Sequence, residues 1–239
     1  MNQSKKENNN INIIVSSYNE EDNIIPFFKE ITKYIINLNY YFNIIYVNDG
    51  STDKTLDNIN FLISNYDNVI EKVTNNIKIS LISYNENRGH EYAMVKGILD
   101  SDAKYVIALD CDLQHPPQLI PQMIDALEDG FDAVLMKRIK NLDAGIIRSF
   151  TSKMYYKLIN IIKKDNLIEG VSDFFAFNNQ ILQQIKKMDK KNIYFIRRTI
   201  QKLSKNSKVI PFIANKRHSG HSHYKFFDLV KLAIRSIKN

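Results

Sequence analysis

Short apolar runs alternate with segments of helical periodicity between Ile11 and Lys137 of this 239-residue chain. The runs cover residues 11–16, 42–48, 78–84, 105–109 and 133–137, and the helical segments cover 21–38, 91–100, a stretch from 52 and one from 116 to about 130. This alternation predicts an α/β fold with a mostly parallel, Rossmann-like sheet flanked by helices and connected by right-handed crossovers. The carboxyl ends of its strands meet at one edge, where such sheets bind ligands.

Length and composition favour one domain. With 44% apolar and 25% charged residues, 239 residues can bury one sizeable core. The single cysteine, Cys111, cannot form an internal disulfide, and no signal peptide opens the chain, so we expect a cytoplasmic setting. Residues 1–10 are polar and are expected to form a disordered tail. No apolar run approaches the roughly 20 residues that a membrane span needs.

The formal net charge of +7 suits a phosphate-rich partner. Charge alone does not choose between a nucleotide, an anionic lipid surface and nucleic acid. The chain lacks a recognisable nucleic-acid-binding module and an aromatic stacking platform. We therefore expect no nucleic-acid partner.

Two aspartates, Asp110 and Asp112, directly follow the apolar run 105–109. Their mutual repulsion must be offset, and a divalent cation bound to diphosphate oxygens would offset it. Gln114 could add a neutral oxygen ligand. Although Asp-x-Asp arises often by chance, its place at a strand end predicts a metal site.

Polar residues also follow the first two predicted strands. Tyr18 could stack on a nucleobase and Glu20 could accept from a ribose, or both belong to an ordinary helix-start turn. After the second strand, Asp49 could accept from a base N–H or a ribose hydroxyl. Gly50 permits a tight turn there, and Ser51 or Thr52 could cap the next helix.

Arg88 and His90 follow the third strand and precede a predicted helix. They could contact a phosphate or a sugar, because a helix start attracts anions. The alternative is an exposed glycine-containing loop.

Taken in order, these segments resemble the motifs of family 2 glycosyltransferases with the GT-A fold. The segments are SSYNEE at 16–21, VNDGSTD at 47–53, NRGHE at 87–91 and DCDLQHPP at 110–117. The chain is most similar to the dolichyl-phosphate mannose synthase and bacterial polyprenyl-phosphate glycosyltransferase branch, over about residues 11–235. The resemblance implies a GT-A domain at 11–225, with residues 226–239 as an amphipathic C-terminal helix.

The resemblance implies a sugar-nucleotide donor site with Mg²⁺ or Mn²⁺ held by Asp110, Asp112 and Gln114. The resemblance gives as expected donor-binding residues Tyr18, Glu20, Asp49, Asp110, Arg217 and Ser222. Arg88 joins this set because of its position before a helix. Arg217 and Ser222 match R-x-x-G-x-S-K-Y, a loop that closes over the donor. His223 replaces its lysine, which leaves one fixed positive charge fewer.

Other matches concern the acceptor. Arg138, closing the strand 133–137, matches a family arginine near the donor and acceptor phosphates, and Arg148 with Ser152 matches a pair near the acceptor phosphate. The alternative for both arginines is a solvated basic face. Asp173 remains from the motif G-D-F-R-L, whereas Phe175 replaces its arginine, so acceptor recognition should differ. We expect the catalytic residues to be Asp173, Arg138 and Asp112.

The implied reaction is inverting transfer of a sugar from a nucleoside diphosphate to a polyprenyl or dolichyl phosphate. A phosphate monoester with a second pKa of about 6 is already anionic and needs no enzymic base. The alternative is transfer to a glycan hydroxyl in surface polysaccharide or lipopolysaccharide biosynthesis, with Asp173 as the base. A remoter alternative is a sugar-nucleotide-binding protein without turnover.

The segment 226–239 is apolar apart from a stripe of polar residues at helical spacing, Asp228, Lys231, Arg235 and Lys238. It suits an interfacial helix, or a terminal helix packed on the sheet. Many relatives continue into two transmembrane helices where this chain stops. Membrane attachment is therefore expected to be peripheral, at the inner face of the cell membrane, or through a membrane partner.

Overall fold

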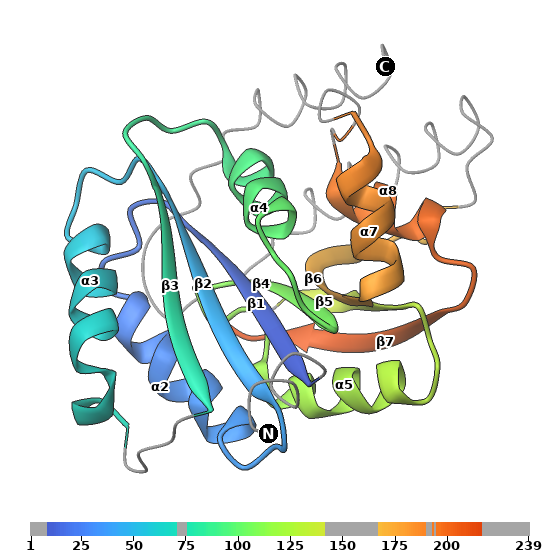
Figure 1. The fold of residues 1–239 in the computed structure, drawn as a ribbon, viewed down its shortest axis with the longest axis horizontal. Helices are drawn as coiled ribbons and strands as arrows, with labels where there is room; N and C mark the ends of the chain where they lie inside the picture. Colours follow the sequence, from blue (N-terminus) through green and yellow to red (C-terminus); the bar gives the residue numbers. More distant parts are fainter. Residues whose placement is uncertain (1–8, 71–75, 142–166, 190–192, 194, 217–239) are drawn as a thin grey trace, which may run out of the picture.

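In a computed structural model, a seven-stranded sheet with the order β3-β2-β1-β4-β6-β5-β7 forms the centre of the molecule (Figure 1). The structure describes residues 9–70, 76–141, 167–189, 193 and 195–216. The strands are β1 (Asn10–Ser17), β2 (Tyr41–Asp49), β3 (Ile77–Tyr84), β4 (Tyr105–Asp110), β5 (Ala133–Asn141), β6 (Val171–Asn178) and β7 (Ser207–Ala214). The helices are α2 (Ile24–Ile35), α3 (Thr55–Asn65), α4 (His90–Leu99), α5 (Ile120–Glu128), α7 (Asn179–Lys187) and α8 (Ile196–Leu203), with short 3₁₀ turns η1 (Tyr66–Asn68) and η2 (Pro117–Leu119).

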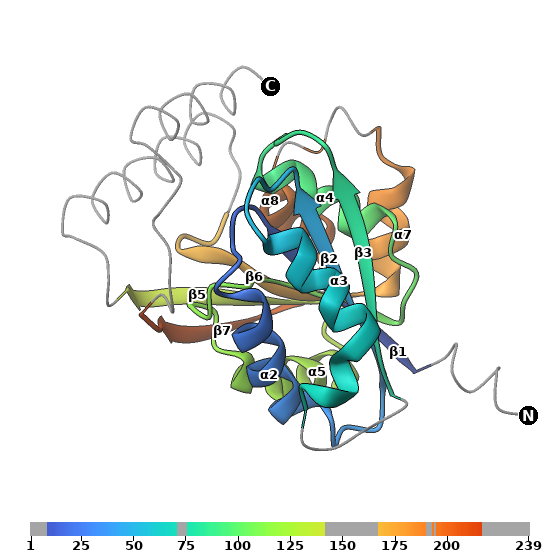
Figure 2. The same cartoon turned by 90° about the vertical axis from the view of Figure 1, so that its left-hand side faces the viewer.

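The helices form a layer on each face of the sheet. Helices α2, α3 and α5 cover one face, and α4, α7 and α8 cover the other (Figures 1 and 2). The strands are apolar on both faces because each face packs against helices, which explains why they appear in the sequence as continuous apolar runs. Within the described ranges, no helix is long and apolar enough to cross a membrane.

The predicted strands and helices between Ile11 and Lys137 are confirmed, but three helices begin later than expected. Helix α5 begins at Ile120, after the turn η2. Helix α2 begins at Ile24 and α3 at Thr55, because the loops before them bind each other. The main-chain N–H of Asn19 donates to Ser51 Oγ (3.0 Å), and the N–H of Thr52 donates to Asn19 Oδ1 (2.8 Å). The expectation that Ser51 or Thr52 caps α3 is therefore wrong.

The sheet is mostly parallel, as predicted, but β6 runs antiparallel between β4 and β5. Its amino end therefore lies at the same edge as the carboxyl ends of β1, β2 and β4, and this places Asp173 beside the predicted site. Strand β5 extends to Asn141 with register shifts against its neighbours, so Arg138 lies within this strand and does not close it. Strand β7, parallel to β5, completes the sheet.

Gly97 allows α4 to pack closely on the sheet, which positions the start of this helix. A Cβ at Gly97 would lie 2.5 Å from Ile14 Cγ2 and 3.0 Å from Val47 Cγ2. We expect Gly97→Ala to lower the free energy of unfolding by about 1–3 kcal/mol through overpacking, less the roughly 1 kcal/mol that alanine gains in helix propensity. Chemical denaturation measures this, with Lys96→Ala as the control. Greater stability of Gly97→Ala than of the wild type would contradict the close packing.

Candidate active site

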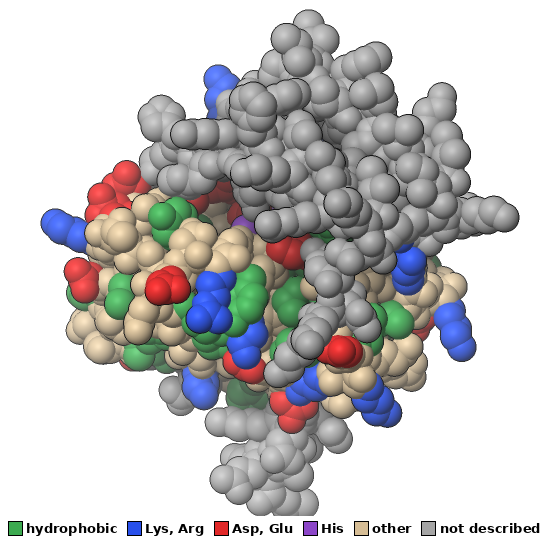
Figure 3. Space-filling model, turned by 90° about the horizontal axis from the view of Figure 1, so that it is seen from above, with side chains coloured by type: hydrophobic (Ala, Val, Ile, Leu, Met, Phe, Trp, Pro, Cys, Tyr) green, Lys and Arg blue, Asp and Glu red, His purple; other side chains and the backbone are tan. Residues whose placement is uncertain are grey.

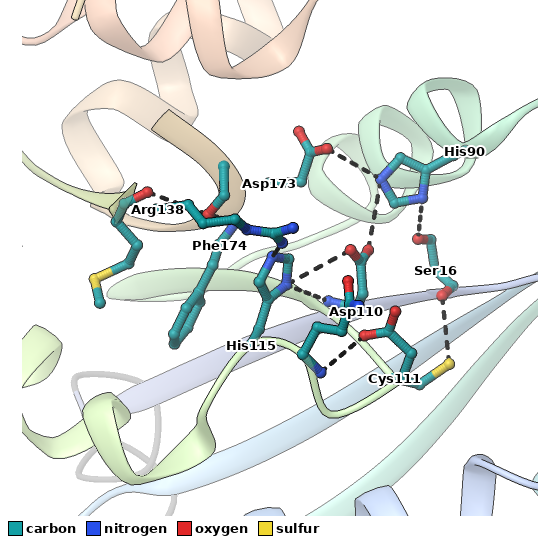
Figure 4. A network of polar contacts seen from close by, with 12 residues as sticks. Ser16, His90, Asp110, Cys111, His115, Arg138, Asp173 and Phe174 are labelled. Carbon is teal, nitrogen blue, oxygen red and sulfur yellow. Dashed lines mark hydrogen bonds and ion pairs between the residues drawn. The ribbon is translucent and has the colours of Figure 1, made fainter. Parts of the chain in front are cut away.

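Charged side chains from separate elements converge at the carboxyl edge of the parallel strands. Figure 4 shows His90 at the start of α4, Asp110 at the end of β4, and His115 in the loop that follows β4. It also shows Arg138 from β5 and Asp173 from β6, with these side chains facing a common centre. The segments lie far apart in the sequence, and the sheet topology brings them together.

Asp110 lies between two histidines. Its Oδ1 is 3.6 Å from His90 Nε2, and its Oδ2 is 3.6 Å from His115 Nδ1. Oδ1 is buried without a hydrogen-bond partner among the described residues. Burial raises the pKa of Asp110 to about 7, with His90 opposing this rise and the charges of Asp112 and Asp173 adding to it. A cation bound here would stabilise the ionised carboxylate.

Asp112 and Gln114 share a tight turn with Leu113 between them. The N–H of Gln114 donates to Asp112 Oδ1 (3.0 Å), and Leu113 has a positive φ of 61°. Asn215, after β7, fastens the turn through its side chain to the Leu113 carbonyl and through its N–H to the Gln114 carbonyl (both 3.2 Å). The predicted metal ligands therefore stay within one braced loop.

The oxygen-rich character of this loop suits a hard divalent cation. Asp112 is buried and Asp110 is partly buried, and Asp110 Oδ1 lacks a hydrogen-bond partner among the described residues. Among the described residues, no group of three or more His, Cys, Asp or Glu side chains is arranged to hold a metal ion by itself. An ion at Asp110 and Asp112 would therefore need further ligands, which diphosphate oxygens can supply.

The sequence offers His90 as a contact to a phosphate or a sugar; this role stays a prediction, and the structure places the ring between two carboxylates. Its Nδ1 is 2.7 Å from Ser16 Oγ, and its Nε2 is 3.6 Å from both Asp110 Oδ1 and Asp173 Oδ2. Burial lowers the pKa of His90, but Asp110 and Asp173 raise it to about 10. Ser16 thus orients a charged imidazolium between two carboxylates.

The pKa of His115 is shifted in the opposite direction to that of His90. His115 Nδ1 accepts the main-chain N–H of Asp110 (3.1 Å), and Arg138 Nη2 approaches its Nε2 at 3.1 Å. A neutral imidazole has one acceptor nitrogen, and protonation of His115 would remove its ability to accept the Asp110 N–H. Burial and the charge of Arg138 lower the pKa of His115 to about 3, so this ring is neutral. It stacks on Phe174.

The two histidines should titrate differently in the metal-free protein. We expect His90 to stay protonated and His115 to stay neutral between about pH 5 and 8, where an unperturbed histidine changes charge. Because the pKa of His90 is raised, its protonation contributes stability below its ordinary pKa of 6.5, and this contribution is lost as pH rises through about 10. Imidazole ¹⁵N NMR measures both states, with signals assigned from His90→Asn and His115→Asn. Titration of either ring within that pH window would contradict the geometry.

Asp49 holds the loop before α4. Its Oδ1 accepts the N–H of Arg88 (2.9 Å), and its Oδ2 accepts the N–H of Gly89 (2.7 Å). Gly50 has a φ of +71°, and a Cβ there would lie 2.4 Å from the carbonyl carbon of Glu86. The loops after β2 and β3 are therefore locked together. A carboxylate can accept more than two hydrogen bonds, so the role of Asp49 in nucleoside binding stays a prediction.

The other predicted donor residues lie at the same edge of the sheet. The exposed Arg88 donates from Nη1 to the Tyr92 hydroxyl (3.2 Å) and lies over the Tyr84 ring (5.8 Å) and the Tyr92 ring (5.4 Å). Glu20 accepts a hydrogen bond from the Asn23 side chain, and Tyr18 is half-buried in the loop after β1. Their donor-binding roles stay predictions.

Arg138 and Asp173 lie together, as the sequence predicts. Arg138 is half-buried over the Phe212 ring (5.8 Å), and its Nε lacks a hydrogen-bond partner among the described residues. Asp173 Oδ1 is 3.4 Å from Nε of Arg197 on α8. Burial opposes ionisation of Asp173, but Arg197 and His90 hold its pKa below its usual value. Sequence reasoning missed Arg197, because a basic residue in a helical segment carries no local signal.

Several predicted residues lie outside the described residues. They are Arg148, Ser152, Arg217 and Ser222, together with the C-terminal segment 226–239 and most of the tail at 1–10. On the described part of the face in Figure 3, acidic and basic side chains are interspersed and do not form a continuous basic surface. This mixed pattern gives no support to a nucleic-acid interface on that part of the face.

Comparison with known proteins identifies the family. The model of the family described as "Glycosyl transferase family 2" matches residues 12–186. A protein named "Putative glycosyltransferase CsbB" from Bacillus subtilis is 31% identical over 95% of this chain and 65% of its own length. "Bactoprenol glucosyl transferase" of Shigella phage SfX is 29% identical over 95% of this chain and 71% of its own length. The chain thus spans about two thirds of the length of these relatives.

Solved structures confirm the fold. Glucosyl-3-phosphoglycerate synthase from Mycobacterium tuberculosis, crystallised with Mn²⁺, uridine-diphosphate-glucose and phosphoglyceric acid, has a TM-score of 0.63 at 15% identity over 99% of this chain and 79% of that one. TarS 1–349 from S. aureus has a TM-score of 0.51 at 18% identity over 84% of this chain and 58% of that one. At these identities the likeness shows the GT-A fold alone. By the family match, the chain belongs to glycosyl transferase family 2.

Proposed function

We propose that this protein is an inverting, metal-dependent glycosyltransferase that moves a sugar from a nucleoside-diphosphate sugar to a polyprenyl phosphate. The observation that carries the proposal is that Asp173 is paired with two cations. Its Oδ2 lies 3.6 Å from His90 Nε2, and its Oδ1 lies 3.4 Å from Arg197 Nε. Relatives named as bactoprenol glucosyl transferases support the acceptor class.

The environment of Asp173 favours a phosphate acceptor over a hydroxyl acceptor. A sugar hydroxyl must lose a proton during transfer, whereas a phosphate near neutral pH is already an anion. Asp173 is paired with two cations, and its pKa is held below its usual value, so it is a weak proton acceptor. These pairings suit a fixed anion that orients His90 and Arg197.

The proposed cofactor is Mg²⁺ or Mn²⁺. Asp110 and Asp112, with Gln114 in the same turn, would hold the ion against the diphosphate of the donor. A bound ion would neutralise the negative charge that develops on the departing nucleoside diphosphate. Arg138 places a second positive charge beside Asp110, and a guanidinium can donate to phosphate oxygens with matching geometry.

The remaining assignments extend this proposal. Tyr18, Glu20, Asp49 and Arg88 would hold the nucleoside end of the donor, while Arg217 and Ser222 would close over the diphosphate. Arg148 and Ser152 would contact the acceptor phosphate. The catalytic domain would extend to about residue 225, with 226–239 as an interfacial helix. Because polyprenyl phosphates reside in membranes, the protein would act at the inner membrane surface or with a membrane partner.

Metal binding can be tested without turnover. Asp112→Asn removes the charge but keeps an oxygen that can accept from the Gln114 N–H, so the turn should survive. We expect Mn²⁺ to increase the thermal stabilisation of the wild-type protein by a nucleoside diphosphate, and Asp112→Asn to lose that increment. Differential scanning fluorimetry measures this, with Asp125→Asn on the exposed side of α5 as the control. An unchanged increment in Asp112→Asn would place the metal elsewhere.

The acceptor class can be tested through Asp173. With a polyprenyl phosphate as acceptor, we expect Asp173→Asn to retain turnover within about tenfold of wild type, because no general base is lost. A lost base costs about 10²–10⁴-fold. Radiolabelled sugar transfer in detergent measures the rate, and thermal denaturation checks folding. Loss of more than about 10²-fold with intact nucleotide binding would contradict this expectation and indicate that Asp173 acts as a base. Nucleotide binding without release of nucleoside diphosphate would indicate a non-catalytic binding protein.

A further inference from the structure

Arg197 is the second residue of α8 and belongs to none of the recognised motifs. Its guanidinium lies beside Asp173 of the site. Its Nε lies 3.4 Å from Asp173 Oδ1, and 29% of its side chain is exposed. It is therefore held on one side and open to solvent on another. Such a position lets the guanidinium contact both Asp173 and a bound ligand, because it carries five N–H donors.

Helix α8 is fixed to the site by two contacts. The N–H of Ile196, its first residue, donates to a carboxylate oxygen of Glu91, which follows His90 in α4. Gln201 Oε1 accepts the N–H of Ile168, in the segment before β6 (2.8 Å). Hydrogen bonds thus connect the helix of Arg197 to the first turn of α4 and to the segment that precedes β6.

Phe175 stands where the related motif G-D-F-R-L has its arginine. Phe175 is fully buried and stacks on Phe177 (ring centroids 6.2 Å apart), so β6 supplies no cation at that position. Arg197 approaches Asp173 from α8 instead. Part of the positive charge near Asp173 is therefore supplied by a helix that follows the strand in the sequence, and His90 supplies the rest from α4.

Arg138 and Arg197 act on the same region from β5 and α8. The carboxylate of Asp173 attracts both arginines. The positive charge of Arg197 repels that of Arg138 and so lowers the pKa of Arg138. Like charges kept this close cost free energy unless anions compensate them. Carboxylates of Asp110, Asp112, Asp173 and Glu91 face these arginines and His90 and compensate their positive charge.

We propose that Arg197 binds the phosphate of the acceptor, opposite Arg138, and that Asp173 holds its guanidinium in place for this contact. The inference rests on the proposed function, because it concerns the acceptor of that reaction. It assigns acceptor recognition to a residue of α8, in place of the cation that β6 lacks at Phe175. Asp173 is then a positioning residue for Arg197.

Steady-state kinetics of the full chain tests this with a short polyprenyl phosphate in detergent and the sugar nucleotide that the wild type uses. We expect Arg197→Gln to raise KM for the polyprenyl phosphate by about 10-fold or more and to leave KM for the sugar nucleotide within about twofold, because charge-assisted hydrogen bonds to phosphate are lost. Arg197→Lys should restore part of the affinity, since lysine keeps the charge but not the planar fork. Arg198→Gln removes the same charge from the same helical turn and should behave as wild type.

The outcomes separate the two proposals. No transfer to polyprenyl phosphate by the wild type would overturn the proposed function, and this inference with it. Wild-type transfer with an unchanged acceptor KM in Arg197→Gln, or an equal effect of Arg198→Gln, would overturn the inference alone. If Arg197→Gln does not fold by circular dichroism, Arg197→Lys decides: an acceptor KM at the wild-type value contradicts the contact, and a selective rise supports it.

Discussion

The imidazolium of His90, held between Asp110 and Asp173, is the interaction on which the rest of the site depends. Two partly buried carboxylates, each 3.6 Å from the same ring nitrogen, repel each other, and a cation between them offsets that cost. Ser16 fixes the ring through its other nitrogen, so the cation cannot turn away. This arrangement lets β4 and β6, which run in opposite directions, present acids at one edge of the sheet.

The first turn of α4 connects the parts of the site. Asp49 accepts the main-chain N–H groups of Arg88 and Gly89, His90 contacts both acids, and Glu91 accepts from the start of α8. Gly97 lets this helix lie close to β1 and β2. The consecutive residues from Arg88 to Glu91 thus join the proposed donor side to the proposed acceptor side. Main-chain hydrogen bonds to Asp49 on one side and to Glu91 on the other fix the position of this turn.

Much of the proposed donor side of the site was predictable because its signals are local. Asp49, Asp110 and Asp112 each follow an apolar run directly, and in a parallel sheet this spacing alone places them at one edge. Strand β6 was harder, because its run from Phe174 to Phe177 is buried on both faces and shows no alternation that would indicate its direction. Arg197 was missed for another reason: its partner Asp173 is distant in the sequence and lies on a different element.

The sequence by itself determined the strand–helix order, the parallel half of the sheet and the oxygen-rich turn at Asp112, because these depend on local periodicity and residue chemistry. Tertiary structure decided the charge of each group. His90 and His115 are the same residue type in the same site, yet the pKa of one is raised to about 10 and that of the other lowered to about 3. The reason is that two carboxylates outweigh the effect of burial at His90, whereas burial and the charge of Arg138 dominate at His115, although Asp110 Oδ2 lies 3.6 Å from its Nδ1.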